Sequence, residues 1–180
     1  ENQGCTVGRK RLAEHASTDW VHFHDADDEL LPNFVERARE WMAREDRPDV
    51  VLFGYEYRDE ESNELLATQR FDAEALQTDP IDYTIRTQIN PFCGLYHRES
   101  CGEAGGPDTD PKVLYNEDCA MHCKLARAGL TFDADPEVDA VREALQSLRR
   151  KGVVEVVYRT VPTFRLAAAR DGIDVEETDS

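Results

Sequence analysis

Long apolar runs are missing from this sequence of 180 residues. A helix that crosses a bilayer needs roughly 20 consecutive apolar residues, and no segment approaches that length. The start also lacks the basic-then-apolar pattern of a secretory leader. We therefore expect a cytoplasmic protein without a membrane span.

Lysine is also scarce, with four lysines against 17 arginines and a total of 38 aspartates and glutamates. The formal net charge is -17, and a surface of that sign repels nucleic acid and anionic membranes. We expect neither as a partner. Because salt screens such self-repulsion, an acidic, lysine-poor surface also suggests a halophilic source as a hypothesis.

The cysteines lack the C-x-x-C spacing of redox and zinc motifs. The sequence contains Cys5, Cys93, Cys101, Cys119 and Cys123. An odd number in a chain of this length argues for reduced thiols and against a disulfide scaffold. Cys119, His122 and Cys123 share a helix face by their spacing, and we favour a thiol-lined core face as the interpretation.

The alternation of helical and strand patterns predicts an α/β layer. Helices are expected at residues 8–16 and from Pro32 onward, and strands at residues 20–24, 50–57, 91–96 and 153–158. Residues 58–90 are polar and irregular, with a short helical candidate near 72–76. We expect one domain at residues 1–172, followed by an acidic tail at 173–180.

Two more helices are predicted in the second half of the sequence. Asn116 is a favourable N-cap for a helix over residues 117–128, and Gly129 is a favourable residue to end it. A further helix, ending at Gly152, is indicated by the spacing of Val138, Val141, Leu145 and Leu148.

Three carboxylates, those of Asp25, Asp27 and Asp28, directly follow the first predicted strand. Like charges this close repel each other, and a divalent cation such as Mg²⁺ or Mn²⁺ relieves the repulsion through hard oxygen ligands. Two alternatives remain open from the residues alone. The segment could be a solvated acidic turn, or His22 and His24 could join the aspartates in a zinc or iron site.

A second acidic pair, Glu117 and Asp118, opens the helix predicted after Asn116 and follows a loop that contains Gly105 and Gly106. Acids in a first helical turn interact favourably with the helix dipole, so simple helix capping explains them in isolation. Because they follow the first acidic segment in the sequence, they are also candidates for a second functional segment.

Taken in order, these segments resemble glycosyltransferase family 2, a family with the GT-A fold. The resemblance rests on Asn2-Gln3-Gly4, Gly8-Arg9-Lys10, Trp20 to Phe23, Asp25-Ala26-Asp27-Asp28, Gly105-Gly106-Pro107-Asp108 and Asn116-Glu117-Asp118. It implies a GT-A-like mixed sheet flanked by helices. Gly8 and Lys10 depart from the alanine and asparagine of the family pattern, whereas Arg9 matches it.

The resemblance also implies roles for these residues. Asp118 is the expected catalytic base, Asp27 the direct metal ligand, and Asp28 a metal-side residue that supports the turn. Substrate-binding roles fall on Asp25, Arg9, Glu117, Gly105 and Gly106. The expected cofactor is Mn²⁺ or Mg²⁺. The expected partners are a nucleotide-diphospho-sugar donor and a hydroxyl acceptor, which is a glycan or is lipid-linked. Residues 58–90 are the expected acceptor-side region.

The implied function is metal-dependent, inverting transfer of a sugar to a hydroxyl. A non-catalytic glycosyltransferase-like binding module and, less favourably, a haloacid-dehalogenase-type phosphatase are the alternatives. Family 2 domains open with a strand–helix–strand unit, and this sequence enters the pattern after it. We therefore expect a truncated domain, a partner chain that completes the sheet, or a circular permutation in which residues 138–175 supply a helix–strand–helix–strand unit.

Overall fold

The computed structural model describes residues 4–25, 28–59, 62–113, 116–143, 154–157 and 163–166. Six strands form a mixed sheet in the order β1-β5-β3-β6-β2, with β4 paired to β3 outside this path. The strands are β1 (Trp20–His22), β2 (Asp28–Leu30), β3 (Val50–Arg58), β4 (Leu65–Gln69), β5 (Gly94–His97) and β6 (Phe132–Glu143). A separate pair of strands, β7 (Val154–Val157) and β8 (Thr163–Leu166), is antiparallel.

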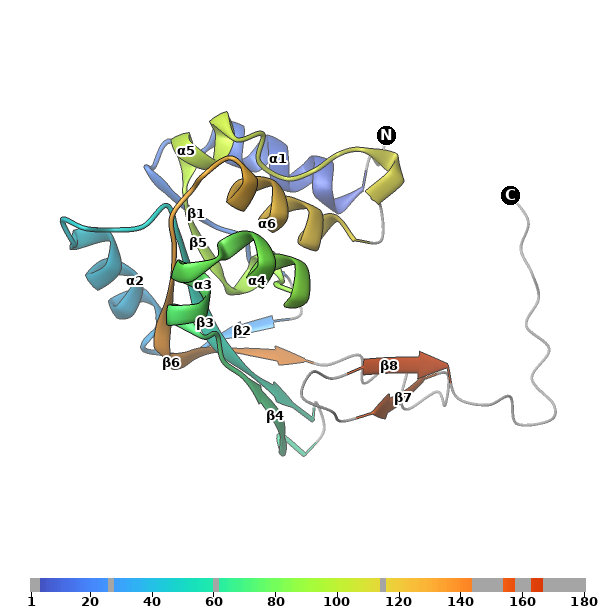
Figure 1. Ribbon diagram of the computed structural model, residues 1–180. Helices are drawn as coiled ribbons and strands as arrows, with labels where there is room; N and C mark the ends of the chain where they lie inside the picture. Colours follow the sequence, from blue (N-terminus) through green and yellow to red (C-terminus); the bar gives the residue numbers. More distant parts are fainter. Residues whose placement is uncertain are drawn as a thin grey trace.

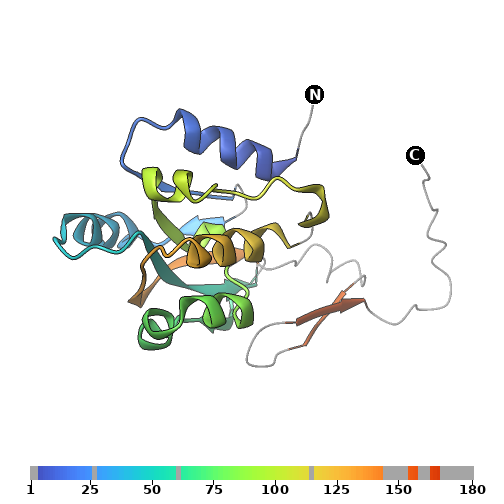
Figure 2. The same cartoon turned by 45° about the horizontal axis from the view of Figure 1, so that its top comes forward.

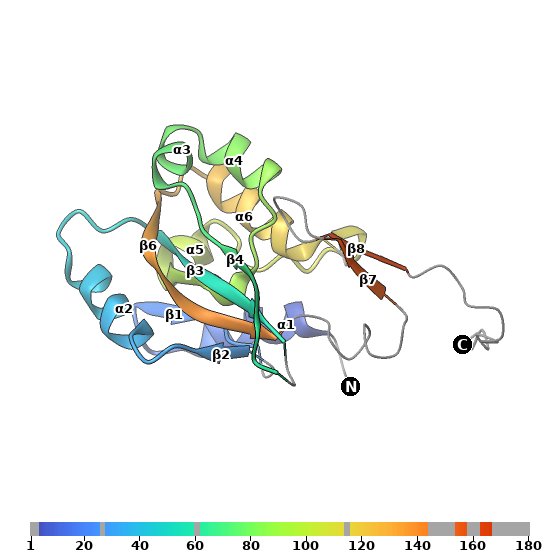
Figure 3. The same ribbon diagram turned by 90° about the horizontal axis from the view of Figure 1, so that it is seen from below.

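The long strands β3 and β6 run parallel at the centre of the sheet, and the other pairs are antiparallel. Figure 3, seen from below, shows β6 lying between β3 and β2. Side chains of β3 alternate between two cores, because successive residues of a strand point to opposite faces. Val50 and Leu52 pack in the larger core, whereas Val51 and Phe53 pack in the smaller one.

Helices cover both faces of the sheet (Figure 1). One face carries α2 (Phe34–Ala43), whose Phe34, Ala38 and Trp41 enter the smaller core. The opposite face carries the helices α1 (Cys5–His15), α3 (Ala73–Thr78), α4 (Pro80–Arg86), α5 (Arg98–Glu103) and α6 (Glu117–Arg127), seen as a row in Figure 2. Short 3-10 turns lie at η1 (Pro91–Cys93) and η2 (Pro111–Val113).

Several predicted boundaries need correction. The helix expected to start around Pro32 begins at Phe34. The described part of residues 58–90, expected to be irregular, contains β4, α3 and α4. Asp72 and Asp79 accept hydrogen bonds from the Ala75 and Asp82 backbone N–H groups and so cap the two short helices.

The helix predicted from Val138 is wrong where the structure describes it, since residues 138–143 continue strand β6. Both neighbours of β6 supply ladder partners there, with Val138 opposite Gly54 and Val141 opposite Glu29. The second helix of the helix–strand–helix–strand unit considered for residues 138–175, expected near residues 164–170, is also wrong at its start, because Thr163–Leu166 form strand β8. The permutation hypothesis required the order helix–strand–helix–strand, which these strands contradict. The tail at 173–180 lies outside the described residues.

Among the described residues, no helix is long and apolar enough to cross a membrane.

Candidate functional site

Arg9 brings the two acidic segments together. From α1, its Nη2 donates a hydrogen bond to Asp25 Oδ1 at 2.8 Å. Its Nη1 donates to Asp118 Oδ1 at 3.0 Å. One guanidinium therefore joins the residue that follows strand β1 to a residue in the first turn of α6.

This bridge is largely enclosed by protein. The Arg9 side chain is 14% exposed, and the side chains of Asp25 and Asp118 are 30% and 22% exposed. Burial alone would lower the pKa of Arg9, but the hydrogen bond and charge of Asp25, together with the charge of Asp118, outweigh it and raise the pKa above its ordinary value. Arg9 therefore remains cationic and holds two like charges close together.

Backbone hydrogen bonds shape the acidic turn after β1. The Asp28 N–H donates to the Asp25 carbonyl at 3.2 Å, and His24 Nε2 donates to the Asp28 carbonyl at 2.9 Å. Asp28 itself is buried at the start of β2. Asp27, the predicted direct metal ligand, lies outside the described residues.

The two histidines of this segment, His22 and His24, hydrogen-bond to backbone carbonyl groups. His22 Nδ1 donates to the Gly94 carbonyl at 2.9 Å, as His24 Nε2 does to Asp28. Burial is the main cause that lowers the pKa of His22. In the part of the chain that the structure describes, no group of three or more His, Cys, Asp or Glu side chains is arranged to hold a metal ion. The zinc or iron alternative therefore gains no support from these histidines.

A buried pair of residues fixes the turn that carries Asp118. His122, one turn further along α6, is fully buried, and its Nδ1 lies 2.7 Å from the Asp118 carbonyl. Its Nε2 lies 2.9 Å from the hydroxyl of Tyr96, which is also fully buried in β5. The start of α6 is thus tied to the sheet.

The protonation of His122 follows from this geometry. Burial lowers its pKa to about 4, so the ring is neutral at ordinary pH. Since the Asp118 carbonyl can only accept, Nδ1 carries the proton, and Nε2 accepts from the Tyr96 hydroxyl, whose one hydrogen is shared with the Pro91 carbonyl at 3.2 Å. A neutral ring with both nitrogens engaged holds the helix without adding charge beside Asp118.

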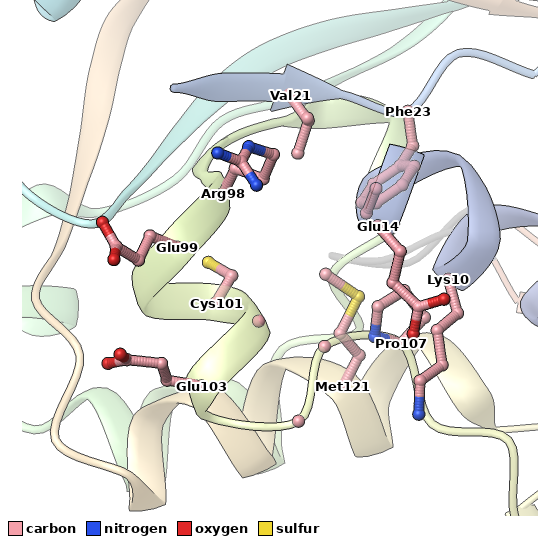
Figure 4. A pocket seen from close by; sticks show the side chains of 14 residues that line it. Lys10, Glu14, Val21, Phe23, Arg98, Glu99, Cys101, Glu103, Pro107 and Met121 are labelled. Carbon is pink, nitrogen blue, oxygen red and sulfur yellow. The ribbon is translucent and has the colours of Figure 1, made fainter. Parts of the chain in front are cut away.

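Gly105 and Gly106 lie at a separate cavity of about 240 Å³ between α1, β1 and α5. Their φ angles of +97° and +54° form a tight turn that favours glycine. Figure 4 shows Met121 extending between Cys101 and Phe23, while Glu99 and Glu103 point outward. Arg9 and Asp25 line a neighbouring groove between α1 and β1.

The structure therefore brings three of the predicted residues, Arg9, Asp25 and Asp118, into direct contact. Glu117 adjoins them, with its Oε1 at 4.0 Å from Cys5 Sγ. The roles of all these residues remain predictions.

The sequence did not predict the contact between Arg9 and Asp118, or the roles of His122 and Tyr96. The spacing of His122 four residues after Asp118 was visible, since residues four apart share a helix face. Its partner Tyr96 could not be found from spacing, because it lies on another element.

Comparison with known proteins shows which fold and family the chain resembles. No curated protein matches the chain. Crystal structures of S. aureus TarS 1-349 match it with UDP bound (TM-score 0.59, 14% identity) and with UDP-GlcNAc bound (TM-score 0.58, 13% identity). Both alignments cover 79% of this chain but 40% of the TarS chain. The chain therefore spans about two fifths of the length of these structures, and at such identity the likeness shows the GT-A fold alone.

Two family models match the sequence. A family of unknown function (DUF5797) covers residues 121–178, from within α6 onward. The model of glycosyl transferase family 2 covers residues 1–104, which include Arg9 and the whole acidic turn. Since that match extends over more than half of the 180 residues, the chain belongs to glycosyl transferase family 2.

Proposed function

We propose that this chain carries the catalytic half of a metal-dependent, inverting glycosyltransferase that moves a sugar from a nucleotide-diphospho-sugar to a hydroxyl acceptor. The observation that carries the proposal is the Arg9 bridge between Asp25 and Asp118. It places the residue proposed as the base beside the turn proposed to hold the donor, and transfer requires these two sites to be adjacent.

Asp118 is the proposed catalytic base. Its carboxylate takes the proton from the acceptor hydroxyl as the oxygen attacks the anomeric carbon of the donor sugar. The bond from that carbon to the diphosphate oxygen breaks in the same step, and the nucleoside diphosphate leaves with the bonding electrons. A single displacement of this kind inverts the anomeric configuration. His122 and Tyr96 hold the turn on which the base lies.

The acidic turn is the proposed metal-binding segment. Its composition suits Mn²⁺ or Mg²⁺, because Asp25, which follows β1, and Asp28, which begins β2, carry hard carboxylate oxygens. Asp27, with Asp28 beside it, would hold the ion, which supplies charge stabilisation for the departing diphosphate when bound. Asp25 and Arg9 would contact the donor, with the guanidinium suited to an anionic group.

The donor class is proposed to be a uridine diphosphate sugar. The TarS structures of the same fold were determined with UDP and UDP-GlcNAc, which makes these the first ligands to test. Residues 58–90 are the proposed acceptor side. Their helix α4 packs on α6, where the Thr84 carbonyl lies 3.7 Å from Cys119 Sγ, close to the base.

A further chain segment or partner is proposed to complete the sheet. β1 pairs with β5 on one side, and no strand within the described residues pairs with its other side. Leu12 of α1 lines the groove along this edge with 71% of its surface exposed. An open strand edge beside an exposed leucine is a favourable place for added β structure.

The proposal is tested by calorimetric titration of the purified chain with UDP-GlcNAc and a GDP-sugar, with and without Mn²⁺, at low and high salt. We expect metal-dependent binding that Asp27→Ala abolishes. Asp118→Asn should keep metal-dependent donor binding and lose sugar transfer to added acceptors. Asp46→Asn, at an exposed position on another face, is the matched control.

Two results would count against the proposal. A folded chain that binds no donor under any condition would indicate the non-catalytic binding module. Full transfer activity in Asp118→Asn would remove that residue from the role of base.

A further inference from the structure

A pair of cysteines begins one residue beyond Asp118 on α6. The thiols of Cys119 and Cys123 face each other across one helical turn, with 3.8 Å between the Sγ atoms. Both residues are partly exposed, whereas Cys93 and Cys101 are buried. These two thiols therefore form an accessible pair outside the proposed catalytic groups.

The neighbouring imidazole does not join the pair. His122 lies between the two cysteines in sequence, but both of its ring nitrogens are engaged, one by the Asp118 carbonyl and one by Tyr96. The backbone carbonyl of Thr84 in α4 lies 3.7 Å from Cys119 Sγ and accepts from its thiol. The protein thus offers two sulfurs and no third side chain among the described residues.

A direct disulfide does not fit this spacing. Residues four apart on a helix have Cβ atoms about 5–6 Å apart, whereas a disulfide needs Cβ atoms about 3.5–4.5 Å apart and an S–S bond of about 2.05 Å. The first turns of α6 would have to open for the bond to form. Hydrogen bonds that hold Asp118 and His122 in place resist such a change.

One bridging atom fits the spacing without any change of the helix. Two metal–sulfur bonds of about 2.3 Å that meet at a tetrahedral angle hold their sulfurs about 3.8 Å apart, which is the separation observed between Cys119 and Cys123. We propose that these residues form a two-thiolate site for a thiophilic divalent cation of the Zn²⁺ and Cd²⁺ class. Water or a small external ligand fills the remaining positions. Each ion bound displaces the two thiol protons, and no electrons are transferred.

This site is chemically distinct from the proposed donor site. Thiolates select soft or borderline ions, whereas the carboxylates of the acidic turn select hard ions such as Mg²⁺. A test with a soft ion in excess Mg²⁺ therefore separates the two, and its outcome does not depend on glycosyl transfer.

The experiment is a Cd²⁺ titration of the reduced full chain in excess Mg²⁺, followed by the ultraviolet charge-transfer absorbance of cadmium–thiolate bonds. We expect a single Cd²⁺ ion per chain and protection of two thiols from a thiol-specific reagent. Cys119→Ser and Cys123→Ser should each weaken binding at least tenfold, whereas Cys5→Ser, which alters the exposed thiol at the start of α1, should not.

Circular dichroism of each variant checks that the helix content of the chain is retained. Absence of the cadmium–thiolate band in the folded wild type would overturn the proposal. Unchanged Cd²⁺ binding in the two serine variants, or formation of a Cys119–Cys123 disulfide that leaves the helix intact, would overturn it as well.

Discussion

Arg9 Nη1 lies 3.0 Å from Asp118 Oδ1, although the two residues are 109 positions apart in the sequence. The same guanidinium contacts Asp25, so its planar fork spans two carboxylates at once. The guanidinium that holds the proposed base is also the group best suited to bind an anionic donor. The anionic donor is therefore expected to compete with Asp118 for Arg9.

The first prediction concerns the shape of the Arg9 side chain. In Arg9→Lys the charge remains, but a compact ammonium cannot replace both arms of the fork. A hydrogen bond between charged groups contributes about 1.5–3 kcal/mol, so we expect the transfer rate to fall roughly tenfold to a hundredfold. Steady-state kinetics with the identified donor measure this effect. Arg11→Lys, on the exposed side of the same helix, should leave the rate unchanged, and equal losses in both variants would contradict the prediction.

The second prediction concerns pH and His122. Its pKa is about 4 in the folded chain against an ordinary value of 6.5, so the unfolded chain binds the proton first as the pH falls. Stability is therefore complete above pH 6.5 and is lost progressively down to about pH 4. The total loss from this group is about 3 kcal/mol.

Urea unfolding at a series of pH values measures this dependence. His122→Gln should remove most of it, whereas His15→Gln, at an exposed position, should retain it. An unchanged pH slope in His122→Gln would show that other groups cause the acid sensitivity.

The third prediction concerns the packing of Tyr96 on Gly94. A Cβ atom placed on Gly94 would overlap the ring and the hydroxyl of Tyr96. That hydroxyl is hydrogen-bonded with His122. Gly94→Ala is therefore expected to lower the free energy of unfolding by about 1–3 kcal/mol, as overpacked cores do. Thermal unfolding measures the change.

Gly102→Ala is the matched control for that variant. A Cβ at Gly102 meets no atom within 4 Å, and the residue lies in helix α5. Alanine there should leave stability unchanged or raise it by up to about 1 kcal/mol. A Gly94→Ala variant as stable as Gly102→Ala would show that Tyr96 is free to move aside.

The fourth prediction concerns Asp135, which anchors α2 to β6. Its side chain is completely buried and accepts hydrogen bonds from Arg37 Nη2, Trp41 Nε1 and the Glu137 backbone N–H. In Asp135→Asn an amide NH₂ donor replaces one carboxylate oxygen, although all the neighbouring groups are donors themselves. Removing one partner of a buried pair lowers the free energy of unfolding by roughly 3 kcal/mol.

Chemical denaturation of this variant is compared with that of Asp46→Asn. Asp46 also pairs with an arginine, Arg44, but on the open surface, where such pairs contribute little. We expect no measurable change for Asp46→Asn. Similar losses in the two variants would mean that burial does not strengthen the Asp135 contacts.

Local patterns in the sequence determined several elements by themselves. The strand predicted at residues 50–57 from its apolar run is found at Val50–Arg58. The helix predicted over residues 117–128 from Asn116 and Gly129 is found at Glu117–Arg127, and Gly129 adopts the positive φ that ends it. These features depend on residues a few positions apart, so their physical causes are contained in the segment. The order of the acidic segments likewise indicated the family.

Only the tertiary structure decided how distant segments pair. Residues 138–143 have a helical spacing of valines, yet they form a strand because β3 and β2 lie on both sides and satisfy their backbone groups. His122 turns into the core because Tyr96 offers it a partner from β5. The Arg9 bridge to Asp118 has the same origin: α1 and α6 are packed on one face of the sheet, and that packing places a cation where two carboxylates converge.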